Sequence, residues 1–345
     1  MNIINGASID HLIYESCKSI IQDGYSHKPH IGEQKWQSLA LNECYLNLYN
    51  PRNRLFQYSE RHTNIFELVG RFIWEITGKS DLETIQYYSR RAGDYAVDGK
   101  IHTAYGKRIF GRGIFIDKLS QFHNISQLLQ VDPLTRRAVI MILDKNDDIY
   151  TDQEYPCVIS LQFYIYDKKL NLIVQVRSES AYRIMPMDIF LFTMIQEIIA
   201  VTLNIEMGMY SHFINNLHIY ENEKEQINRF LQAKNSYLIT SMKPLSQKDK
   251  LYKSLEELIK LEEDIRLVDS DRGLSSLSIK TYEELKQGKY KEVFNQFKLI
   301  LFMYKYLQKE NCNYTPLYIY NLLMEPYKTL VKNYINYRNP DVEIS

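Results

Sequence analysis

Residues 155–188 read YPCVISLQFYIYDKKLNLIVQVRSESAYRIMPMD, and the pattern in this stretch decides how the middle of the chain folds. Apolar and polar side chains alternate from Cys157 to Tyr166, which is the period of a half-buried strand. Asp167–Lys169 predicts a turn, and residues 171–177 predict the returning strand of a β-hairpin. Met187–Leu203 is almost wholly apolar and predicts a buried central helix.

The same periodicities predict further elements on both sides of the hairpin. Towards the N-terminus they are helices over residues 8–22, 64–77 and 81–88, a loop at 51–54 and a strand over 138–143. Towards the C-terminus they are a strand over 210–220 and helices over 250–268 and 282–309, separated by the Ser- and Gly-containing segment 269–278. The chain after residue 222 is charged and helical in pattern, and its residues suggest no chemistry.

The composition limits the classes of function. Among 345 residues, 42 Lys and Arg balance 42 Asp and Glu, so the formal net charge is zero. Proteins that hold nucleic acid polymers by bulk charge carry a basic excess, which argues against that class. We therefore expect any phosphate site to be local and built from a few placed arginines.

Four cysteines, Cys17, Cys44, Cys157 and Cys312, are widely spaced, and no CxxC or Cys/His metal spacing is present. We therefore expect neither a metal site nor a disulfide framework. The first residues show no basic stretch followed by an apolar run, and charges interrupt the apolar stretches before the length of a membrane span. The expectation is a cytoplasmic protein without membrane contact.

Cys157 stands at the head of the first hairpin strand, directly after Pro156. A cysteine at such a place is most often a small buried hydrophobic residue. Arg136–Arg137 precedes it and Arg177–Ser178 follows it, so the hairpin could bring guanidinium groups close to the thiol. Nearby positive charge lowers the pKa of a thiol and raises the fraction of nucleophilic thiolate.

Short motifs with polar side chains lie on both sides of Cys157. They are Trp74–Asp81, Ala104–Gly106, Asp132–Arg137, Tyr155–Cys157, Leu161–Tyr164, Val176–Ser178, Pro186–Asp188 and His218–Tyr220. In order and spacing these motifs resemble the thymidylate synthase family, over roughly residues 50–222. The family's Pro-Cys nucleophile, Gln-Phe-Tyr strand, Arg-Ser phosphate site and His-x-Tyr sugar site all have counterparts. One such motif alone is a weak signal, but the whole set in register is a strong one.

The resemblance implies a role for each matched residue. Cys157 would add to C6 of a pyrimidine nucleotide, which makes C5 a nucleophilic carbon, and Tyr105 would help to remove the C5 proton. Arg177 and Ser178 would hold the 5′-phosphate. The full set of implied substrate-binding residues is Arg52, Arg54, Arg136, Arg137, Gln162, Arg177, Ser178, Ser180, Asp188, His218 and Tyr220.

Two of these implied sites have plainer alternatives. Arg136–Arg137 would complete the phosphate site from the other subunit of a dimer, with Arg52 or Arg54 as a further, loosely matched contact. His218 and Tyr220 would bind a sugar hydroxyl. The alternative for Arg136–Arg137 is a solvated strand edge. For Tyr105 and Tyr220 the alternative is an ordinary core or surface position, since the chain has 28 tyrosines.

Asp188 stands where thymidylate synthases have the Asn that reads uracil. Uracil accepts at O4 and donates from N3, whereas cytosine donates from N4 and accepts at N3. A carboxyl group can accept from the N4 amino group and, where it or N3 carries a proton, satisfy N3 as well. A mismatched buried polar pair costs about 1–3 kcal/mol, enough for strong discrimination. The family's cytidylate hydroxymethylases also have Asp in place of this Asn, so Asp188 favours cytosine as the base. The alternative is that Asp188 satisfies free backbone amides at a helix N-terminus.

Several departures from the family concern catalysis and folate. Arg71 stands where the family has a catalytic Glu, and a cation cannot act as that acid or base. Either Glu67 or Glu75 substitutes, or the reaction differs; Glu67 lies one turn earlier on a similar face, whereas Glu75 is expected to point elsewhere. Ser180 replaces the Asp that anchors the pterin, and Ile184 replaces a nearby Gly. The short C-terminus that closes over folate is also missing.

These observations together predict an α/β protein of the thymidylate synthase-like fold, with a large twisted mixed β-sheet covered by helices. Residues 1–222 form the expected catalytic domain and residues 223–345 a helical C-terminal extension. The hypothesised reaction is hydroxymethylation of CMP or dCMP at C5 with 5,10-methylenetetrahydrofolate, in a homodimer with shared active sites. Two alternatives stay open: a C5 methylase or hydroxymethylase of UMP or dUMP, and a nucleotide-binding protein that has lost catalysis.

Overall fold

A mixed β-sheet forms the centre of the computed structural model, which describes residues 1–28, 37–58, 61, 63–147, 155–233, 240–308 and 317–338. Its strands follow the order β1-β3-β7-β6-β5-β4, with β2 paired to β3. They are β1 (Asn2–Gly6), β2 (Tyr25–His27), β3 (Ser38–Leu48), β4 (Val139–Met141), β5 (Val158–Tyr166), β6 (Lys169–Ser180) and β7 (Glu206–Tyr220). The β1–β3 and β6–β7 pairs are parallel and the others antiparallel, so the predicted mixed sheet is confirmed.

The predicted hairpin is the pair β5–β6. Its turn has Asp167 and Lys168 in the left-handed region, at φ 50° and 57°, as a tight hairpin turn requires. At the other end of the pair the register shifts between Val158 and Ser160. Such a bulge changes which side chains face the core, and here it lies directly after Cys157.

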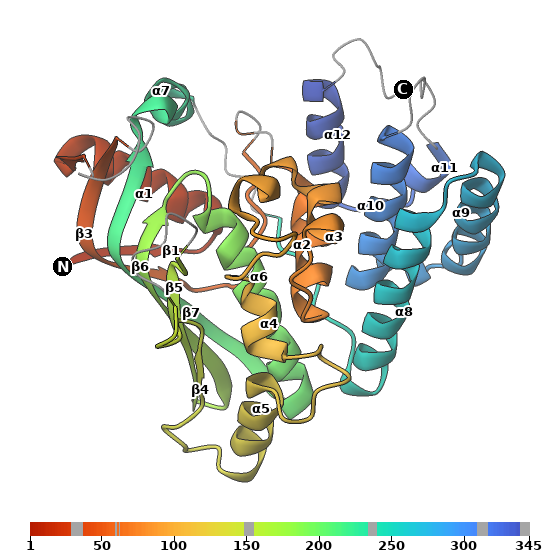
Figure 1. Cartoon of the computed structure of the whole chain (residues 1–345), viewed down its shortest axis with the longest axis horizontal. Coiled ribbons are helices and arrows are strands. Elements are labelled where there is room, and N and C mark those ends of the chain that lie inside the picture. Colours follow the sequence, from red (N-terminus) through yellow and green to blue (C-terminus); the bar gives the residue numbers. More distant parts are fainter. Residues whose placement is uncertain are drawn as a thin grey trace.

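Helices pack against the sheet, and most of them lie to its right in Figure 1, whereas the N-terminal helix lies at the upper left. Those before residue 204 are α1 (Ile9–Asp23), α2 (Ile65–Ile76), α3 (Leu82–Tyr88), α4 (Tyr105–Phe110), α5 (Gln121–Val131) and α6 (Met185–Leu203). In α2 the side chain of Asn64 caps the first turn by accepting a hydrogen bond from the backbone N–H of Glu67. The helix ends before Gly78, whose φ of 64° leaves the helical region.

The central helix α6 fills the core, as predicted. Fifteen of its residues are buried, including the polar Asp188, Gln196 and Glu197. By length and composition it could also cross a membrane, so the expectation that charges interrupt every apolar stretch was too strict. Its most apolar window is 78% buried inside this fold, as in the core helix of a globular protein.

The C-terminal region is helical, but two predicted boundaries are wrong. Its helices are α7 (Lys224–Gln232), α8 (Lys248–Leu267), α9 (Asp271–Leu285), α10 (Val293–Leu307), α11 (Leu317–Tyr320) and α12 (Tyr327–Arg338). The expected linker 269–278 instead begins α9, because Ser270 caps it by accepting from the N–H of Gly273. The expected helix over 282–309 breaks at Gly288, which has a φ of 94°.

Helices α8, α10 and α12 stand beside α2 and α3 on the side away from the sheet (Figure 1). Phe297 of α10 makes ring contacts with Phe72 of α2 and Phe190 of α6, and it is fully buried. Tyr304 of α10 stacks on Phe66 of α2. The C-terminal helices therefore share one core with the sheet-covering helices, and the domain boundary at residue 222 stays a prediction.

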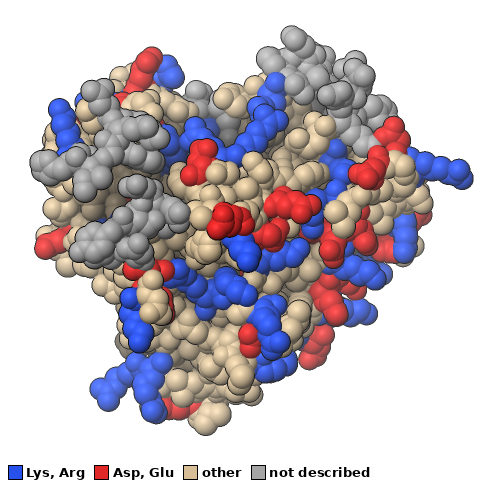
Figure 2. Space-filling view, viewed as in Figure 1, with Lys and Arg blue, Asp and Glu red and all other residues tan. Residues whose placement is uncertain are grey.

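Acidic and basic side chains are interspersed over the visible surface (Figure 2), in keeping with the zero formal charge. Mixed signs of this kind keep a surface solvated without producing a strong field of one sign. Any specific attraction for an anion must come from placed groups, such as those around Cys157.

Candidate active site

Cys157 lies beside a guanidinium group, as the sequence predicted. Its Sγ atom is 3.6 Å from Nη2 of Arg177 on β6. Arg177 is held in place because its Nε donates to the carbonyl oxygen of Pro156 at 2.9 Å and its Nη2 donates to that of Tyr155 at 2.7 Å. The ring of Tyr155 also lies under the guanidinium, 5.1 Å from ring centroid to Cζ. A fixed positive charge at this distance stabilises the thiolate form of the half-buried cysteine.

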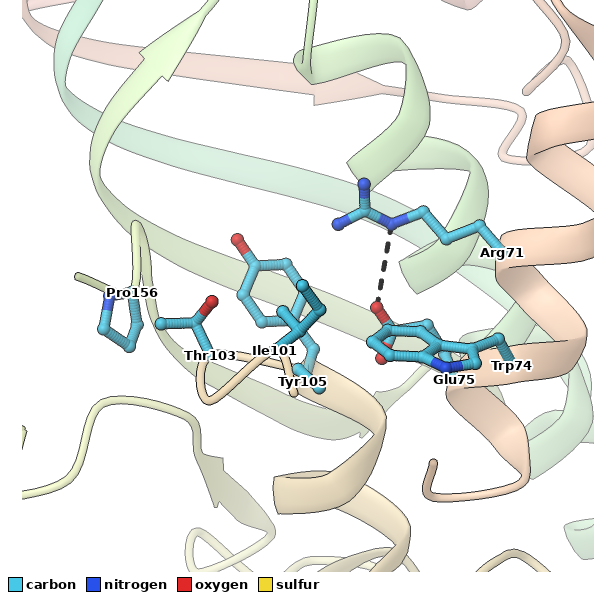
Figure 3. Close-up of a pocket in the computed structure, with 8 residues that line it drawn as sticks. Arg71, Trp74, Glu75, Ile101, Thr103, Tyr105 and Pro156 are labelled. Atoms are coloured by element: carbon cyan, nitrogen blue, oxygen red, sulfur yellow. Dashed lines mark ion pairs between the residues drawn. The ribbon is translucent and has the colours of Figure 1, made fainter. Parts of the chain in front are cut away.

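A small pocket opens next to Pro156, between α2 and the start of α4. It is lined by Arg71, Trp74, Glu75, Ile101, Thr103, Ala104, Tyr105 and Pro156. Figure 3 shows the side chains of Arg71 and Tyr105 extending into the same space, with Glu75 beside them. Nε of Arg71 lies 3.7 Å from Oε1 of Glu75, so the cation at the unusual position is partly neutralised by the next turn of its own helix.

The pairing of Glu75 with Arg71 corrects one expectation. Glu75 was expected to point away from the site, but residues 67, 71 and 75 recur every four positions and share one face of α2. Glu75 is the one at the pocket, where it is 1% exposed. Glu67 sits at the start of the helix and accepts from Nδ2 of Asn64 at 3.4 Å, so Glu75 rather than Glu67 is the carboxylate beside Arg71.

Close packing of α4 against α2 explains why a glycine, Gly106, follows Tyr105 at the start of α4. The backbone N–H of Gly106 donates to Oε2 of Glu75. A Cβ atom at Gly106 would collide with the backbone carbonyl of Glu75, so only glycine lets α4 approach α2 this closely. This approach places Tyr105 in the pocket.

Tyr105 is protonated at neutral pH in this environment. Burial raises the pKa of its phenol well above the usual value, and Asp188, Cys157 and Glu179 add to the effect while Arg71 opposes it. The hydroxyl can therefore donate a hydrogen bond or orient a water molecule. It does not supply a phenolate base.

Asp188 lies in the first turn of α6 and is 1% exposed. Pro186 opens this helix, and the backbone N–H of Asp188 donates to the carbonyl oxygen of Ile184 at 3.2 Å. The carboxyl group acts electrostatically on Tyr105, Glu179 and Tyr210, and of these Tyr105 lines the pocket. This is the residue expected to read the base.

Three further buried polar groups were not found from the sequence. They are Glu179 on β6 and Tyr210 and His212 on β7. His212 Nε2 lies 3.7 Å from Oε2 of Glu179, and its Nδ1 lies 3.1 Å from the hydroxyl of Tyr210. Burial lowers the pKa of His212 to about 3, so its imidazole is neutral and gives Glu179 no positive charge.

The expected phosphate and sugar residues form a second polar group along β6 and β7. Ser178 Oγ donates to Oδ1 of Asn216 at 3.4 Å, and Nδ1 of His218 lies 3.2 Å from the same oxygen. Burial lowers the pKa of His218 to about 4, so it offers a neutral ring that suits a hydroxyl better than a phosphate. Tyr220 follows at 4.9 Å from His218, centroid to centroid.

Arg52 and Arg54, the loosely matched phosphate contacts, both pair with a carboxylate, and their contact with phosphate stays a prediction. Nε of Arg52 donates to Oε1 of Glu197 on α6 at 2.7 Å, and Nη2 of Arg54 donates to Oε2 of the same carboxylate. Burial alone would raise the pKa of Glu197, but the two guanidinium groups outweigh it and hold the pKa below its usual value. Arg54 and Glu197 are fully buried, so this is a structural ion pair.

The remaining expected residues lie at the surface. Arg136 and Arg137 are exposed just before β4, where a second subunit could reach them. Gln162 is exposed on β5 between the buried Leu161 and Phe163, so strand alternation points it away from the helix-covered face and the pocket. The expected contact of Gln162 with substrate stays a prediction.

The place expected to anchor folate carries no carboxylate. Ser180 is buried, and its Oγ accepts from the backbone N–H of Arg183 at 3.3 Å. The side chain of Arg183 lies 4.9 Å from the ring centroid of Tyr220 and donates to Glu223 at 2.7 Å. Ile184 adds a branched side chain at the same turn. These residues do not fit a folate held in the way that the resemblance implies.

Comparisons with known proteins agree with this geometry. The sequence profile of the family described as thymidylate synthase matches residues 13–269. Two proteins named deoxyuridylate hydroxymethyltransferase, from Delftia phage PhiW-14 and Bacillus phage SP01, are 26% identical over 222 and 230 residues. These alignments cover 60% and 64% of this chain but only 60% and 59% of the phage proteins, so the chain spans about three fifths of their length.

Cellular relatives and solved structures give the same result. Thymidylate synthase from Bacillus licheniformis is 27% identical over 225 residues, which cover 61% of this chain and 79% of that protein. The structure of thermostable thymidylate synthase A from Bacillus subtilis superposes with a TM-score of 0.55 at 20% identity, covering 65% of this chain and 84% of that one. At 20% identity, this structural similarity shows that the two proteins share a fold.

Proposed function

Because the chain belongs to the thymidylate synthase family, we propose that it is a one-carbon transferase that modifies C5 of a pyrimidine nucleoside monophosphate. The observation that carries this proposal is the 3.6 Å contact between Nη2 of Arg177 and Sγ of Cys157. A thiolate at this place adds to C6, and the electrons of the C5=C6 bond move towards C4, so that C5 becomes a carbon nucleophile.

The finer proposal is that the base is cytosine and the product a 5-hydroxymethyl derivative of CMP or dCMP. It is supported by Asp188, a buried carboxyl group that acts electrostatically on Tyr105 of the pocket. A carboxyl group can accept from the N4 amino group of cytosine and, where it or N3 carries a proton, satisfy N3 as well, whereas an ionised carboxylate has no proton to donate to the O4 acceptor of uracil. Cys157 must stay a free thiol, which suits the reducing cytoplasm that we propose as its location.

The carbon donor of the family is 5,10-methylenetetrahydrofolate, and it is the donor to test first. Because Ser180 and Ile184 do not fit the expected pterin site, we assign no contact of this chain to it. The assignment of the nucleotide half of the reaction does not depend on the donor, since addition of Cys157 to C6 precedes carbon transfer.

A second candidate is a hydroxymethylase of dUMP. It is favoured by the names of the two phage relatives, both deoxyuridylate hydroxymethyltransferases. The two candidates differ in the edge that Asp188 must recognise. An Asp188→Asn variant separates them: it should lose cytidylate turnover and gain uridylate turnover if the carboxyl group reads cytosine.

We also propose a homodimer with shared active sites, and the sheet supports it. A row of partly or fully exposed side chains, Tyr45, Phe213, Gln175 and Ser160, runs across four strands on the side opposite the helices. Packing two such faces together would bury this row and bring Arg136–Arg137 of one subunit towards the other. Mixing the inactive variants Cys157→Ser and Arg137→Ala should then restore part of the activity, whereas a monomer would stay inactive.

The experiment that tests the activity uses CMP, dCMP, UMP and dUMP, each with 5,10-methylenetetrahydrofolate, and detects the product by mass spectrometry. A hydroxymethyl group on CMP or dCMP is the expected result. Turnover of dUMP alone would defeat the cytosine assignment. Exchange of the C5 hydrogen in heavy water without folate tests the nucleotide half by itself, and a silent result with every nucleotide would favour a binding protein that has lost catalysis.

A further inference from the structure

Asn216 of β7 lies between Ser178 and His218, the residues expected to contact the phosphate and the sugar. In the register of the sheet it stands beside Ser178 of β6 on one side and Asn42 of β3 on the other. His218 follows two residues later along β7, and in a strand this spacing brings a side chain back to the same face. Asn216 is therefore placed to act on both halves of the expected nucleotide site.

The orientation of the Asn216 amide is fixed by a chain of hydrogen bonds that begins on the edge strand β2. The hydroxyl of Tyr25 donates its single proton to Oδ1 of Asn42 at 3.0 Å. The Tyr25 oxygen can then only accept a hydrogen bond, and Nδ2 of Asn216 donates to it at 3.2 Å. The amide nitrogen of Asn216 thus faces Tyr25, and its oxygen Oδ1 faces Ser178 and His218.

This orientation decides which ring nitrogen of His218 carries hydrogen. Burial lowers the pKa of His218 to about 4, so near neutral pH the ring has a single N–H group. Nδ1 lies 3.2 Å from Oδ1 of Asn216. Because an amide oxygen has no proton to donate, this contact is a hydrogen bond only when Nδ1 carries the hydrogen. The backbone oxygen of Asn216 also acts on the ring as an acceptor, which favours the same form.

Nε2 of His218 is the nitrogen left for a ligand. It has no hydrogen-bond partner within the described residues, and His218 keeps 9% of its surface open to solvent. An unprotonated imidazole nitrogen accepts a hydrogen bond from a hydroxyl, but it has nothing to give to a phosphate oxygen, which is itself an acceptor. The tautomer therefore selects a hydroxyl group at this place.

We propose that Asn216 is a positioning residue that holds His218 in the tautomer protonated at Nδ1, so that Nε2 accepts a hydrogen bond from a sugar hydroxyl of the nucleotide. This inference rests on the proposed function and deepens it, because it assigns the donor and the acceptor of the sugar contact. Ser178 Oγ donates to the same Oδ1 at the longer distance of 3.4 Å. A hydroxyl has one proton, so Ser178 must release Asn216 before it donates to a phosphate, whereas His218 keeps its bond throughout.

Nitrogen NMR of the protein without nucleotide tests the tautomer directly. The chain has eight histidines, and the signals of His218 are those lost in His218→Gln. At about pH 8 the wild type should show a protonated Nδ1 and an unprotonated Nε2. In Asn216→Leu the accepting side chain is lost, and the Nε2–H form that a free imidazole favours should become the major one. Asn216→Asp keeps an oxygen that only accepts and should retain the wild-type form.

Asn215→Leu is the matched control, because Asn215 is the preceding residue of β7 and its side chain is exposed. The ring signals of His218 in this variant should match those of the wild type. A wild type with the hydrogen on Nε2 would overturn the proposal, and so would an Asn216→Leu variant that keeps the wild-type form. If Asn216→Leu does not fold, the wild-type spectrum alone still decides the tautomer.

Nucleotide affinity tests the contact with the sugar. Calorimetric titration compares CMP with analogues that carry fluorine in place of the 2′- or the 3′-hydroxyl, since fluorine is of similar size but cannot donate. At the contacted position the wild type and Asn216→Asp should bind the fluoro analogue about 10-fold less tightly than CMP. Asn216→Leu, whose Nε2–H can donate, should show a smaller ratio. Its kcat for C5-hydrogen exchange should stay within about two-fold of wild type, because the sugar contact is the same in the ground and transition states.

These titrations separate failure of this inference from failure of the proposed function. Equal ratios for the wild type and Asn216→Leu at both sugar positions would overturn the sugar contact while nucleotide binding itself stands. If only uridylates bind, UMP and its fluoro analogues give the same test. Absence of binding by every cytidylate and uridylate would defeat the proposed function and the sugar contact with it, and the ring signals, measured without nucleotide, would still show whether Asn216 sets the tautomer.

Discussion

The buried acid Glu179 should make the stability of the protein depend on pH in an unusual direction. Its folded-state pKa lies above the ordinary value of 4.5, so its favourable contribution is present below that value and is lost as the pH rises towards the folded pKa. Glu179→Gln cannot ionise. We therefore expect the variant to gain free energy of unfolding relative to wild type at about pH 8 but not at about pH 4, as measured by urea unfolding.

In the difference between wild type and Glu179→Gln, the contributions of the other buried groups to the pH dependence of stability cancel. His212 acts with the opposite sign, because its folded pKa of about 3 is below the ordinary 6.5 and its effect is lost as the pH falls. This effect is the same in both proteins and drops out of the difference. An identical difference at the two pH values would show that Glu179 ionises normally.

Individual site residues differed in how well the sequence revealed them. Cys157 and Arg177 are far apart in sequence, yet hairpin pairing between their strands predicted their contact. Glu179 was missed because regular alternation from Val174 and Val176 would point it away from the core. The structure nevertheless buries Glu179, and no sequence pattern announces this.

Between elements, the approach of α4 to α2 depends on one glycine. Gly106→Ala would push a methyl group into the backbone carbonyl of Glu75 and displace Tyr105 from the pocket. We expect a loss of about 1–3 kcal/mol in the free energy of unfolding. We also expect a drop in C5-hydrogen exchange larger than the loss of folded protein explains, measured on the folded fraction.

Gly93→Ala is a suitable control for this prediction. Its added Cβ would meet only the side-chain end of Gln86, at 3.1 Å, which can move aside. Exchange by this variant should match wild type. If Gly106→Ala also matched wild type, the close approach of the two helices would not be what positions Tyr105.

Regular elements with strong periodicity were predictable, and their ends were less so. The hairpin β5–β6 and the core helix α6 are long and have clear patterns, so packing and local preference agree. The segment 269–278 was taken for a linker because of its Ser and Gly content. In the structure Ser270 caps α9, and Gly288 lies at the break between α9 and α10; these roles depend on position within a turn more than on composition.

Over the whole molecule, the C-terminal helices act as part of the core. Phe297 of α10 lies fully buried against Phe72 of α2 and Phe190 of α6. Phe297→Ala should lower the free energy of unfolding by about 3–5 kcal/mol. Circular dichroism and tyrosine fluorescence should still report one coincident transition, because the cavity weakens the core that both parts share.

Leu267→Ala, at the end of α8, controls for loss of an apolar side chain, since Leu267 is 56% exposed. Its effect should stay within about 0.5 kcal/mol. Two separate transitions in the Phe297→Ala variant would instead indicate an extension that folds by itself. The sequence could not show this packing, because a helical pattern reveals an apolar face but not the surface that the face will cover.

The central claim is that Cys157 forms a transient bond to C6 of a pyrimidine nucleotide beside Arg177. The most direct measurement is exchange of the C5 hydrogen of CMP and dCMP in heavy water, followed by mass spectrometry, with wild type and Cys157→Ser at matched folded concentrations. The account predicts exchange by the wild type and none above background by the serine variant. Equal exchange by both proteins would contradict it.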